Sequence, residues 1–204
     1  STAYKELTTV AGASFNDHAD KLTNALRYNS ANGCGLLTTN GSTDCITITE
    51  GTCRLSDLQI AITGSNGRAL SNSGVSNLGK YNNCIFEGTQ TGVGTTVGII
   101  GFTGITSSGF NVNNCLFVQR ASAADHIVGT GTSIIAFNNC TIVAPDDLAT
   151  APTQIWLSGA SGTVTVQNGS MFAGDSTKAI KGGSATFNFT TETVWGQTNK
   201  PTKL

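Results

Sequence analysis

The sequence feature that most constrains the fold is a short segment that recurs five times along the chain. Its copies begin at Leu55, Tyr81, Val112, Phe137 and Val166, with 25 to 31 residues from one start to the next. The first and sixth positions are always apolar, and the sixth holds Ile60, Phe86, Phe117, Ile142 and Met171. The third position holds Asp57, Asn83, Asn114, Asn139 and Asn168. Strict spacing within the copies and uneven spacing between them indicate stacked units joined by loops of different lengths.

Each copy has the character of a strand, because it is short, contains β-branched or aromatic residues and is flanked by Gly, Ser and Asn. The first and fourth positions are three residues apart, so both can face the interior only if the chain bends between them. Asn and Asp tolerate the left-handed backbone conformation that such a bend requires. We therefore expect Asn83, Asn114 and Asn139 to occupy buried, stacked bends, with their side chains hydrogen-bonded to one another or to neighbouring backbone.

These observations predict an all-β protein, a right-handed parallel β-helix of about six coils across residues 36–195. Further strands are expected upstream of the repeated segments, at Val97–Ile100, His126–Val128, Gln154–Leu157 and Ala179–Ile180. A β-sandwich also contains many short strands, but it gives no reason for one Asn column to recur. Residues 1–35 are expected to form an N-terminal arm and capping helix, and residues 196–204 a C-terminal tail.

The expected capping helix extends from Ser14 to Tyr28. Ser14 and Asp17 have the spacing of a capping box, in which a Ser side chain and an acidic side chain satisfy the first free amides of a helix. The apolar residues that follow have the spacing of one helix face, and they are Phe15, Ala19, Leu22 and Leu26. An open β-helix end exposes unpaired strand edges, so we expect this helix to cover that end.

The capping segment and the Asn-Asn-Cys-apolar-Phe rungs at Asn82–Phe86 and Asn113–Phe117 carry a resemblance to a known superfamily. Over Leu36 to Trp195 the chain resembles the pectate-lyase-like single-stranded right-handed β-helices, and among them bacteriophage tailspikes and virion surface proteins. The resemblance implies the β-helix fold and, for virion members, a parallel homotrimer. Because such folds host many unrelated activities, function has to be argued from a site.

Charge and hydropathy exclude several classes of function. Only 11% of the residues are charged, against about 25% in an ordinary soluble domain, and the formal net charge is −1. The chain therefore has no basic surface of the kind that binds nucleic acid or an anionic membrane. Apolar runs stay far below the roughly 18 residues of a membrane span. The opening residues Ser1–Glu6 do not have the form of a signal peptide, so we expect synthesis in a cytoplasm, although a signal removed upstream would leave the same start.

Polysaccharide cleavage, the usual chemistry of the superfamily that the chain resembles, needs two carboxyl groups about 5 to 9.5 Å apart. Glu87 and Asp125 are the best candidates, because they come from successive coils. Acidic residues do not recur in matching columns, however, and solvated loop carboxylates are the simpler explanation of this pair. Asp146 and Asp147 follow a Pro in a sequence typical of a turn. We therefore expect no catalytic residues.

The signatures of the superfamily's enzymes are not matched. Pectate lyases carry a calcium-binding acidic cluster and a catalytic Arg, whereas Arg54, Arg68 and Arg120 have no acidic cluster beside them in matching coils. Of the polygalacturonase motifs only the Asp pair at 146–147 is present, and His126 is followed by Ile rather than Gly. His18 and His126 have no nucleophile nearby in the sequence.

The six cysteines predict neither a metal site nor a disulfide framework. Zinc sites need close pairs such as Cys-x-x-Cys, and this chain has none. Cys84, Cys115 and Cys140 share the fourth, inward position of the repeat, where a free thiol behaves as a small apolar group. Parallel side-chain directions in stacked strands disfavour a disulfide, so we expect free buried thiols there. The redox state of the remaining three, Cys34, Cys45 and Cys53, stays open. No cofactor is expected.

The expected function is a non-enzymatic structural protein of a virion, either a capsid decoration or a short spike. Two alternatives remain, a tailspike-like protein that binds or cleaves cell-surface polysaccharide and a secreted, extracellular β-helix adhesin. Expected partners are two further copies of the chain and capsid or tail proteins. Ile85 and Leu116 form an outward apolar stripe that faces a loop or another subunit. The C-terminal tail is expected either to seal the open C-terminal coil or to reach a neighbouring chain or the capsid, with Trp195 as its candidate anchor.

Overall fold

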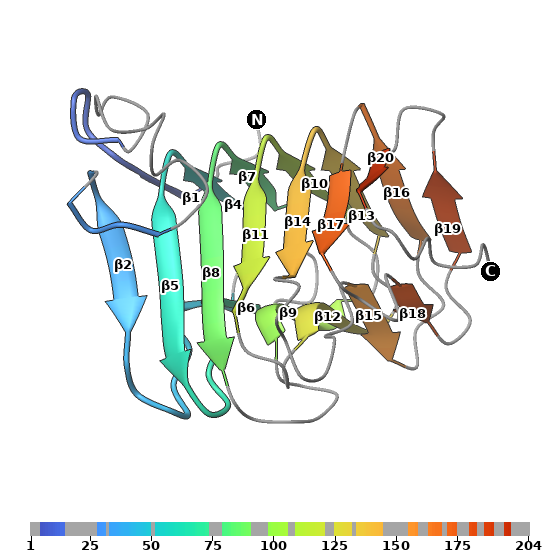
Figure 1. Ribbon diagram of the computed structural model, residues 1–204, viewed down its shortest axis with the longest axis horizontal. Coiled ribbons are helices and arrows are strands. Elements are labelled where there is room, and N and C mark those ends of the chain that lie inside the picture. Colours follow the sequence, from blue (N-terminus) through green and yellow to red (C-terminus); the bar gives the residue numbers. More distant parts are fainter. Residues whose placement is uncertain are drawn as a thin grey trace.

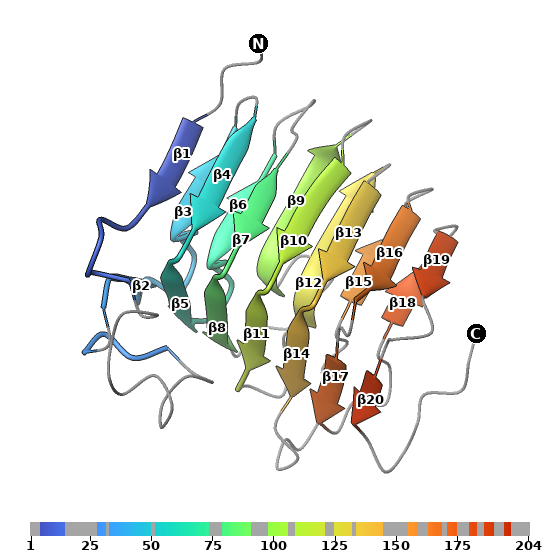
Figure 2. The same ribbon diagram turned by 90° about the horizontal axis from the view of Figure 1, so that it is seen from above.

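The computed structural model describes residues 5–14, 28–31, 33–49, 52–73, 79–90, 98–105, 109–120, 125–131, 134–144, 155–158, 163–168, 171–174, 180–182, 186–189 and 194–196. These residues form three parallel β-sheets that together make a β-solenoid (Figures 1 and 2). The chain passes from the first sheet to the second and then to the third before it returns to the first. The described part is all-β, as predicted, and contains no helix.

Sheet A consists of β1 (Lys5–Thr8), β4 (Cys53–Ser56), β7 (Lys80–Asn82), β10 (Gly109–Asn113), β13 (Ile134–Asn138), β16 (Thr163–Gln167) and β19 (Thr186–Phe189). Sheet B consists of β2 (Gly35–Thr38), β5 (Gln59–Gly64), β8 (Ile85–Gln90), β11 (Leu116–Gln119), β14 (Thr141–Ala144), β17 (Met171–Gly174) and β20 (Val194–Gly196). Sheet C consists of β3 (Ile46–Ile48), β6 (Leu70–Asn72), β9 (Gly98–Ile105), β12 (Asp125–Gly131), β15 (Ile155–Ser158) and β18 (Ile180–Gly182). Where the sequence predicts about six coils, the sheets contain seven, seven and six strands.

The strands predicted upstream of the repeated segments are all present, and they are β9, β12, β15 and β18 of sheet C. At the N-terminal end the sheet begins earlier than predicted, because β1 lies in the predicted N-terminal arm and pairs in parallel with β4. At the other end β20 pairs with β17. Of the predicted capping helix, Ser14 to Tyr28, residues 15–27 lie outside the described residues. Of the predicted tail, 196–204, residues 197–204 lie outside them, and Gly196 belongs to β20.

Apolar columns run through the interior along the stacking direction. The first repeat position forms one column in register, made of Leu55, Tyr81, Val112, Phe137 and Val166, and all five side chains are buried. Aromatic rings stack in the next column, where the rings of Phe86 and Phe117 lie 5.2 Å apart and nearly parallel. Such stacking contributes beyond the burial of apolar area. The core is therefore continuous from one rung to the next.

The Asn column forms the bends between sheets A and B, as predicted. The backbone φ angles at these positions are positive: Asp57 60°, Asn83 53°, Asn114 52°, Asn139 49° and Asn168 56°. The side-chain amide of Asn83 donates to Asp57 at 3.1 Å, that of Asn114 to Asn83 at 3.2 Å, and that of Asn139 to Asn114 at 2.8 Å. The expected hydrogen-bonded ladder is therefore present. It is not buried, because Asn114 and Asn139 are exposed and Asn83 is half-buried.

The last copy of the repeat differs from the alignment made on the sequence. Val166 pairs with Phe137 as expected, but Ile142 pairs with Phe172, and Met171 pairs with Thr141. The chain therefore has one more residue between these two strands than in the preceding rungs. The sequence pattern places Met171 at the sixth position of this copy. In the structure Phe172 takes that place in the column, beside Ile142.

Candidate functional site

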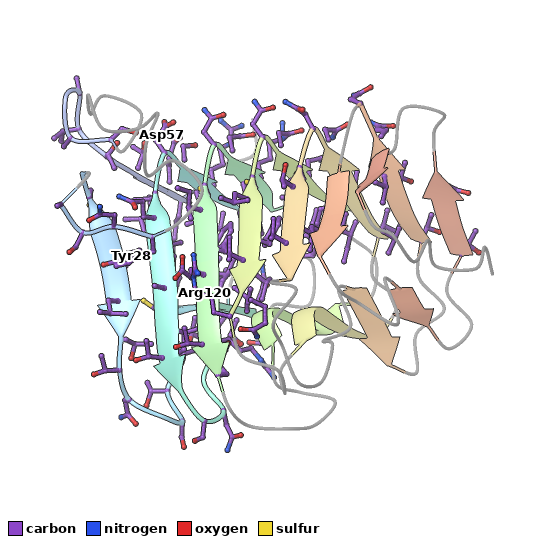
Figure 3. All side chains as sticks on the ribbon, viewed as in Figure 1. Tyr28, Asp57 and Arg120 are labelled. Carbon is purple, nitrogen blue, oxygen red and sulfur yellow. The ribbon has the colours of Figure 1, made fainter. Side chains whose placement is uncertain are left out.

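Glu87 is the carboxylate that the sequence favours for acid–base chemistry, and the structure places it on the outer face of β8. Its Oε1 accepts a hydrogen bond from Arg120 Nε at 2.8 Å, and its Oε2 accepts one from the backbone N–H of Tyr28 at 2.8 Å. Tyr28 and Arg120 lie on this side of the molecule in Figure 3. The side chain of Glu87 is 12% exposed and that of Arg120 is 37% exposed. Both carboxylate oxygens are thus engaged within the protein, and Glu87 ties three segments of the chain together.

Asp125, the expected partner of Glu87, belongs to a different sheet. Its backbone begins β12 in sheet C and pairs with Gly98, whereas Glu87 lies in sheet B and pairs with Ala61 and Val118. The structure does not assemble the two into one described site. His126, next in the chain, also lies in β12. His18, Asp146 and Asp147 lie outside the described residues.

The outward apolar stripe is not exposed. Ile85 is 3% and Leu116 is 7% exposed, and with Val118 they form a small apolar cluster on the outer face of sheet B. Gln59, also on this face, is buried, and its side-chain amide exchanges two hydrogen bonds with the backbone of Asn29, at 2.9 and 3.1 Å. The sequence predicts that this stripe faces a loop or another subunit. The single chain itself buries it, which favours the first alternative. The stripe therefore does not support an interface between subunits.

The cysteines of the repeat are free and buried, as predicted, and the other three are also free thiols. Burial raises the pKa of the Cys140 thiol to about 12 and raises that of Cys115 well above its ordinary value near 9. Their sulfurs lie within hydrogen-bonding distance of backbone carbonyls of the preceding rung, Cys115 with Tyr81 and Cys140 with Val112. These groups are protonated at neutral pH and act as small core residues. The backbone of Cys34 occupies the same column one rung before Leu58, since Gln59 N donates to the Cys34 carbonyl as Ile85 N does to that of Leu58.

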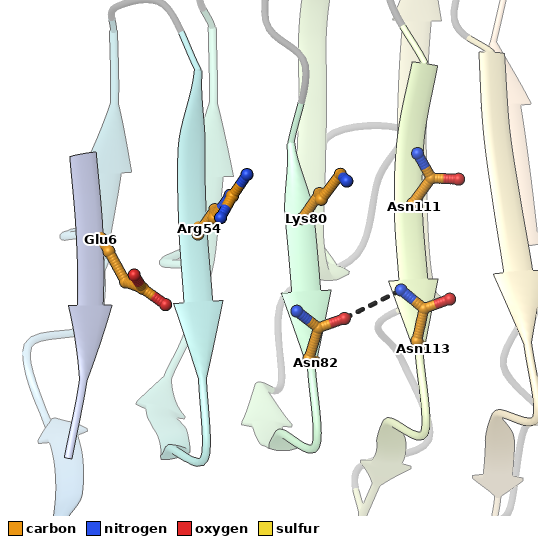
Figure 4. Close-up of a pocket in the computed structure, with 6 residues that line it drawn as sticks. All are labelled: Glu6, Arg54, Lys80, Asn82, Asn111 and Asn113. Carbon is orange, nitrogen blue, oxygen red and sulfur yellow. Dashed lines mark hydrogen bonds between the residues drawn. The ribbon is translucent and has the colours of Figure 1, made fainter. Parts of the chain in front are cut away.

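The described surface is hollowed on the outer face of sheet A, where an open groove of about 500 Å³ crosses β1, β4, β7 and β10. Figure 4 shows its lining, which is polar throughout: Glu6, Arg54, Lys80, Asn82, Asn111 and Asn113. Strand register explains the lining, because Glu6, Arg54, Lys80 and Asn111 occupy successive places in one outward column. The groove therefore contains two cationic side chains, one carboxylate and three amides on a rigid sheet.

A second amide ladder forms one wall of this groove. Asn113 donates to Asn82 at 2.9 Å, and Asn138 on the next strand donates to Asn113 at 3.0 Å. Gln167 continues the ladder by donating to Asn138, so these side chains hold each other in fixed rotamers. The sequence contains this column one position before the Asn bends, at the second position of the repeat. The recurrence of an amide at this position in four copies, Asn82, Asn113, Asn138 and Gln167, is the sequence signal for this wall.

The three arginines singled out in the sequence lie apart from one another. Arg54 lines the groove, Arg120 binds Glu87, and Arg68 lies across Gly101 of β9 and donates to Ser71 at 3.2 Å. Among the described residues no group of three or more His, Cys, Asp or Glu side chains is arranged to hold a metal ion. The described residues also include no helix long and apolar enough to cross a membrane.

The fold and the groove together define a parallel β-solenoid whose sheet A carries an open polar groove. Comparison of the chain with models of known protein families, with curated proteins and with solved structures finds no match.

Proposed function

We propose that the protein is a non-enzymatic structural component of a virion, a capsid decoration or short spike made in the host cytoplasm. The observation that carries this proposal is that stacked, hydrogen-bonded side chains on the surface link successive rungs. The Asp57–Asn83–Asn114–Asn139 ladder links four successive rungs, and the Asn82–Asn113–Asn138 ladder links three. Such ladders make a stiff rod whose neighbouring rungs support one another.

The engagement of Glu87 also supports a structural role. A general acid has to deliver a proton to the leaving group, and it needs an oxygen that faces the substrate. Both oxygens of Glu87 are bound to Arg120 and to the backbone of Tyr28. Its position suits a structural clamp between segments rather than proton transfer.

The resemblance of the sequence to pectate-lyase-like β-helices of virions supports a more specific proposal. We propose that the solenoid is right-handed, that it belongs to the pectate-lyase-like superfamily, and that it functions as a homotrimer. Trp195, the expected anchor, pairs with Phe172 and continues the column of Ile142 and Phe117, so its register places it in the last rung of sheet B and does not support an anchor on a neighbouring chain. The buried state of Ile85 and Leu116 removes the stripe from the support for a trimer. Sedimentation equilibrium should give a mass near three protomers, and a protein that stays monomeric at high concentration contradicts this part.

The proposal is tested by mass spectrometry of purified virions from the organism that encodes the chain. The expected result is the intact chain at a fixed ratio to the major capsid protein. The enzyme alternative is tested in parallel with a panel of capsular and O-chain polysaccharides, read by reducing ends and by unsaturated uronate absorbance. Cleavage that Glu87→Gln abolishes in a folded protein contradicts the structural proposal, and so does the absence of the chain from particles.

A second candidate, polysaccharide binding without cleavage, is favoured by the groove on sheet A. Its amides and cations can form hydrogen bonds with the hydroxyl and acidic groups of a glycan, and they lie along the stacking direction. Binding of the same polysaccharide panel, measured by calorimetry without any product release, separates this candidate from the structural role.

A further inference from the structure

We propose that the outer face of sheet A, from β1 to β13, is a docking surface for a protein partner that presents an extended acidic segment. This inference rests on the proposed structural role, since a component of a particle has to bind a neighbouring protein. It names the face and the chemistry of that contact.

The outer faces of the three sheets differ in how far the chain itself covers them. On sheet B the outward residues Ala61, Ile85 and Val118 are buried. On sheet C Ser71 is buried, and the side chain of Arg68 lies across Gly101. The described outward side chains of sheet A are instead half-buried or exposed over the whole stretch from β1 to β13. Among the described residues, exposed outward side chains on the other two sheets lie at the first strands, at Leu37 of β2 and Thr47 of β3, whereas on sheet A they recur on β1, β7 and β13, across a span of five strands.

The charges on this face favour a partner that has acidic groups and also a hydrogen-bond donor or cation for Glu6. Arg54 and Lys80 occupy neighbouring places in one outward column, so two positive charges lie side by side, and Glu6 lies beyond them. A simple anion gains from the two cations but is repelled by Glu6. A protein segment can place acidic side chains over Arg54 and Lys80 and a donor over Glu6. Such complementarity sets the register and specificity of protein contacts.

An apolar contact point lies next to the charged column. Ile134 begins β13, points outward and is 46% exposed. Its partner in register is Gly109, where a side chain would meet nothing within 4 Å. An exposed apolar side chain beside an open backbone, two residues along the strand from the register of Asn111, gives this polar face an apolar contact point, as protein interfaces have.

The open shape and rigid lining favour a macromolecular partner over a small ligand. Small molecules usually bind in concave, mainly apolar clefts that bury most of their surface, whereas this groove is open and lined only by polar groups. The amides of Asn82 and Asn113 are already fixed by their mutual hydrogen bond. A partner therefore loses little free energy in ordering them, which favours binding.

The experiment uses the full chain and a synthetic peptide of alternating Glu and Ser as the probe. Binding is measured by calorimetry at low salt, and the site is located by NMR from the methyl signals of Ile134. We expect saturable binding that shifts these signals and weakens as salt is added. Lys80→Gln should weaken binding about fivefold, the upper range for an exposed ion pair. Ile134→Ser should weaken it by a similar factor through lost apolar contact.

Thr47→Glu, on the exposed outer side of β3, is the matched control, because it changes the net charge by the same amount as Lys80→Gln. It should leave binding unchanged, and equal losses in the two variants overturn the assignment of the face. Absence of saturable peptide binding overturns the proposal. Tight binding of a sulfated glycan in place of the peptide overturns the class of partner. Detection of the chain in virions is independent of these results, so the docking surface and the proposed structural role can fail separately.

Discussion

Substitution of Asn114 tests the physical basis of the stacked bends. Asn114 has a φ of 52° and joins β10 to β11. Its amide donates to Asn83 at 3.2 Å and its carbonyl oxygen accepts from Asn139 at 2.8 Å. Asn114→Leu removes both hydrogen bonds and places a side chain with an ordinary β-carbon in the left-handed region. Asn114→Gly removes the same hydrogen bonds but adopts this φ without strain.

The expected magnitudes follow from these two contributions. The ladder is exposed at Asn114, so each lost hydrogen bond costs about 0.5 kcal/mol, the low end of the usual range. The left-handed conformation costs an ordinary residue about 1 to 2 kcal/mol. Asn114→Leu should therefore lower the free energy of unfolding by about 2 to 3 kcal/mol, and Asn114→Gly by about 1 kcal/mol.

The assay is urea unfolding followed by circular dichroism, with the slope of the transition compared between variants. Asn111→Leu is the control, because Asn111 lies three residues away in β10, with its side chain on the outer face, and the change should cost below about 0.5 kcal/mol. If Asn114→Leu is no more destabilising than this control, the bend does not constrain the residue. If Asn114→Gly costs as much as Asn114→Leu, the backbone conformation is not the source of the effect.

Three further predictions concern packing, titration and the covered face. Gly79→Ala should lower the free energy of unfolding by about 1 to 3 kcal/mol, because the new β-carbon would lie 2.3 Å from the buried ring of Phe110. Gly109→Ala, where a β-carbon meets nothing within 4 Å, should be nearly neutral, and equal shifts of the melting temperature in the two variants contradict this packing. Because the pKa of Cys140 is raised from about 9 to about 12, the stability that the buried thiol contributes is present below pH 9 and is lost as the pH rises toward 12. The urea midpoint should therefore fall between pH 9 and pH 12, and it should fall less in Cys140→Ala. Ile85→Asp places a carboxylate at a 3% exposed site and should unfold or strongly destabilise the single chain; a stably folded Ile85→Asp monomer contradicts the cover over this face.

The bends and the core columns were predictable because they follow from local physics. A residue three places from another inward residue needs a bend, and Asn is the ordinary non-Gly solution for a positive φ. The five positive φ angles at the third position confirm this reasoning. Burial of the bend was the part that failed, because the turn of the backbone directs Asn114 and Asn139 outward, where they bond to one another rather than to the core.

The shift in the last rung could not be found from residue types. Met171 and Phe172 are both apolar, and either one satisfies the sixth position of the repeat. Only strand pairing shows that Phe172 follows Ile142 in the column. Similarly, Ile85 and Leu116 occupy outward positions, and alternation alone does not say whether the chain returns to cover them.

The groove could not be predicted from the sequence, because it is formed by contacts between distant segments. Glu6 joins Arg54 and Lys80 because β1 pairs with β4, and the sequence placed residues 1–35 outside the β-helix. The link from Glu87 to Arg120 and to the backbone of Tyr28 has the same origin, since these residues lie 33 and 59 positions away from Glu87 in the sequence. Repeat columns identify what stacks, but they do not identify which arm or loop lies on the outer face.

The central claim, that segments one repeat apart stack in parallel and in register, is tested most directly by NMR of the labelled chain. Backbone contacts measured by nuclear Overhauser effects should join Val112 to both Tyr81 and Phe137, in the pattern of parallel strands, because these residues are paired in sheet A. Asn114 should show side-chain contacts to Asn83 and Asn139. Antiparallel contacts between strands adjacent in the sequence, with none between residues one repeat apart, would contradict the solenoid and every inference drawn from its columns.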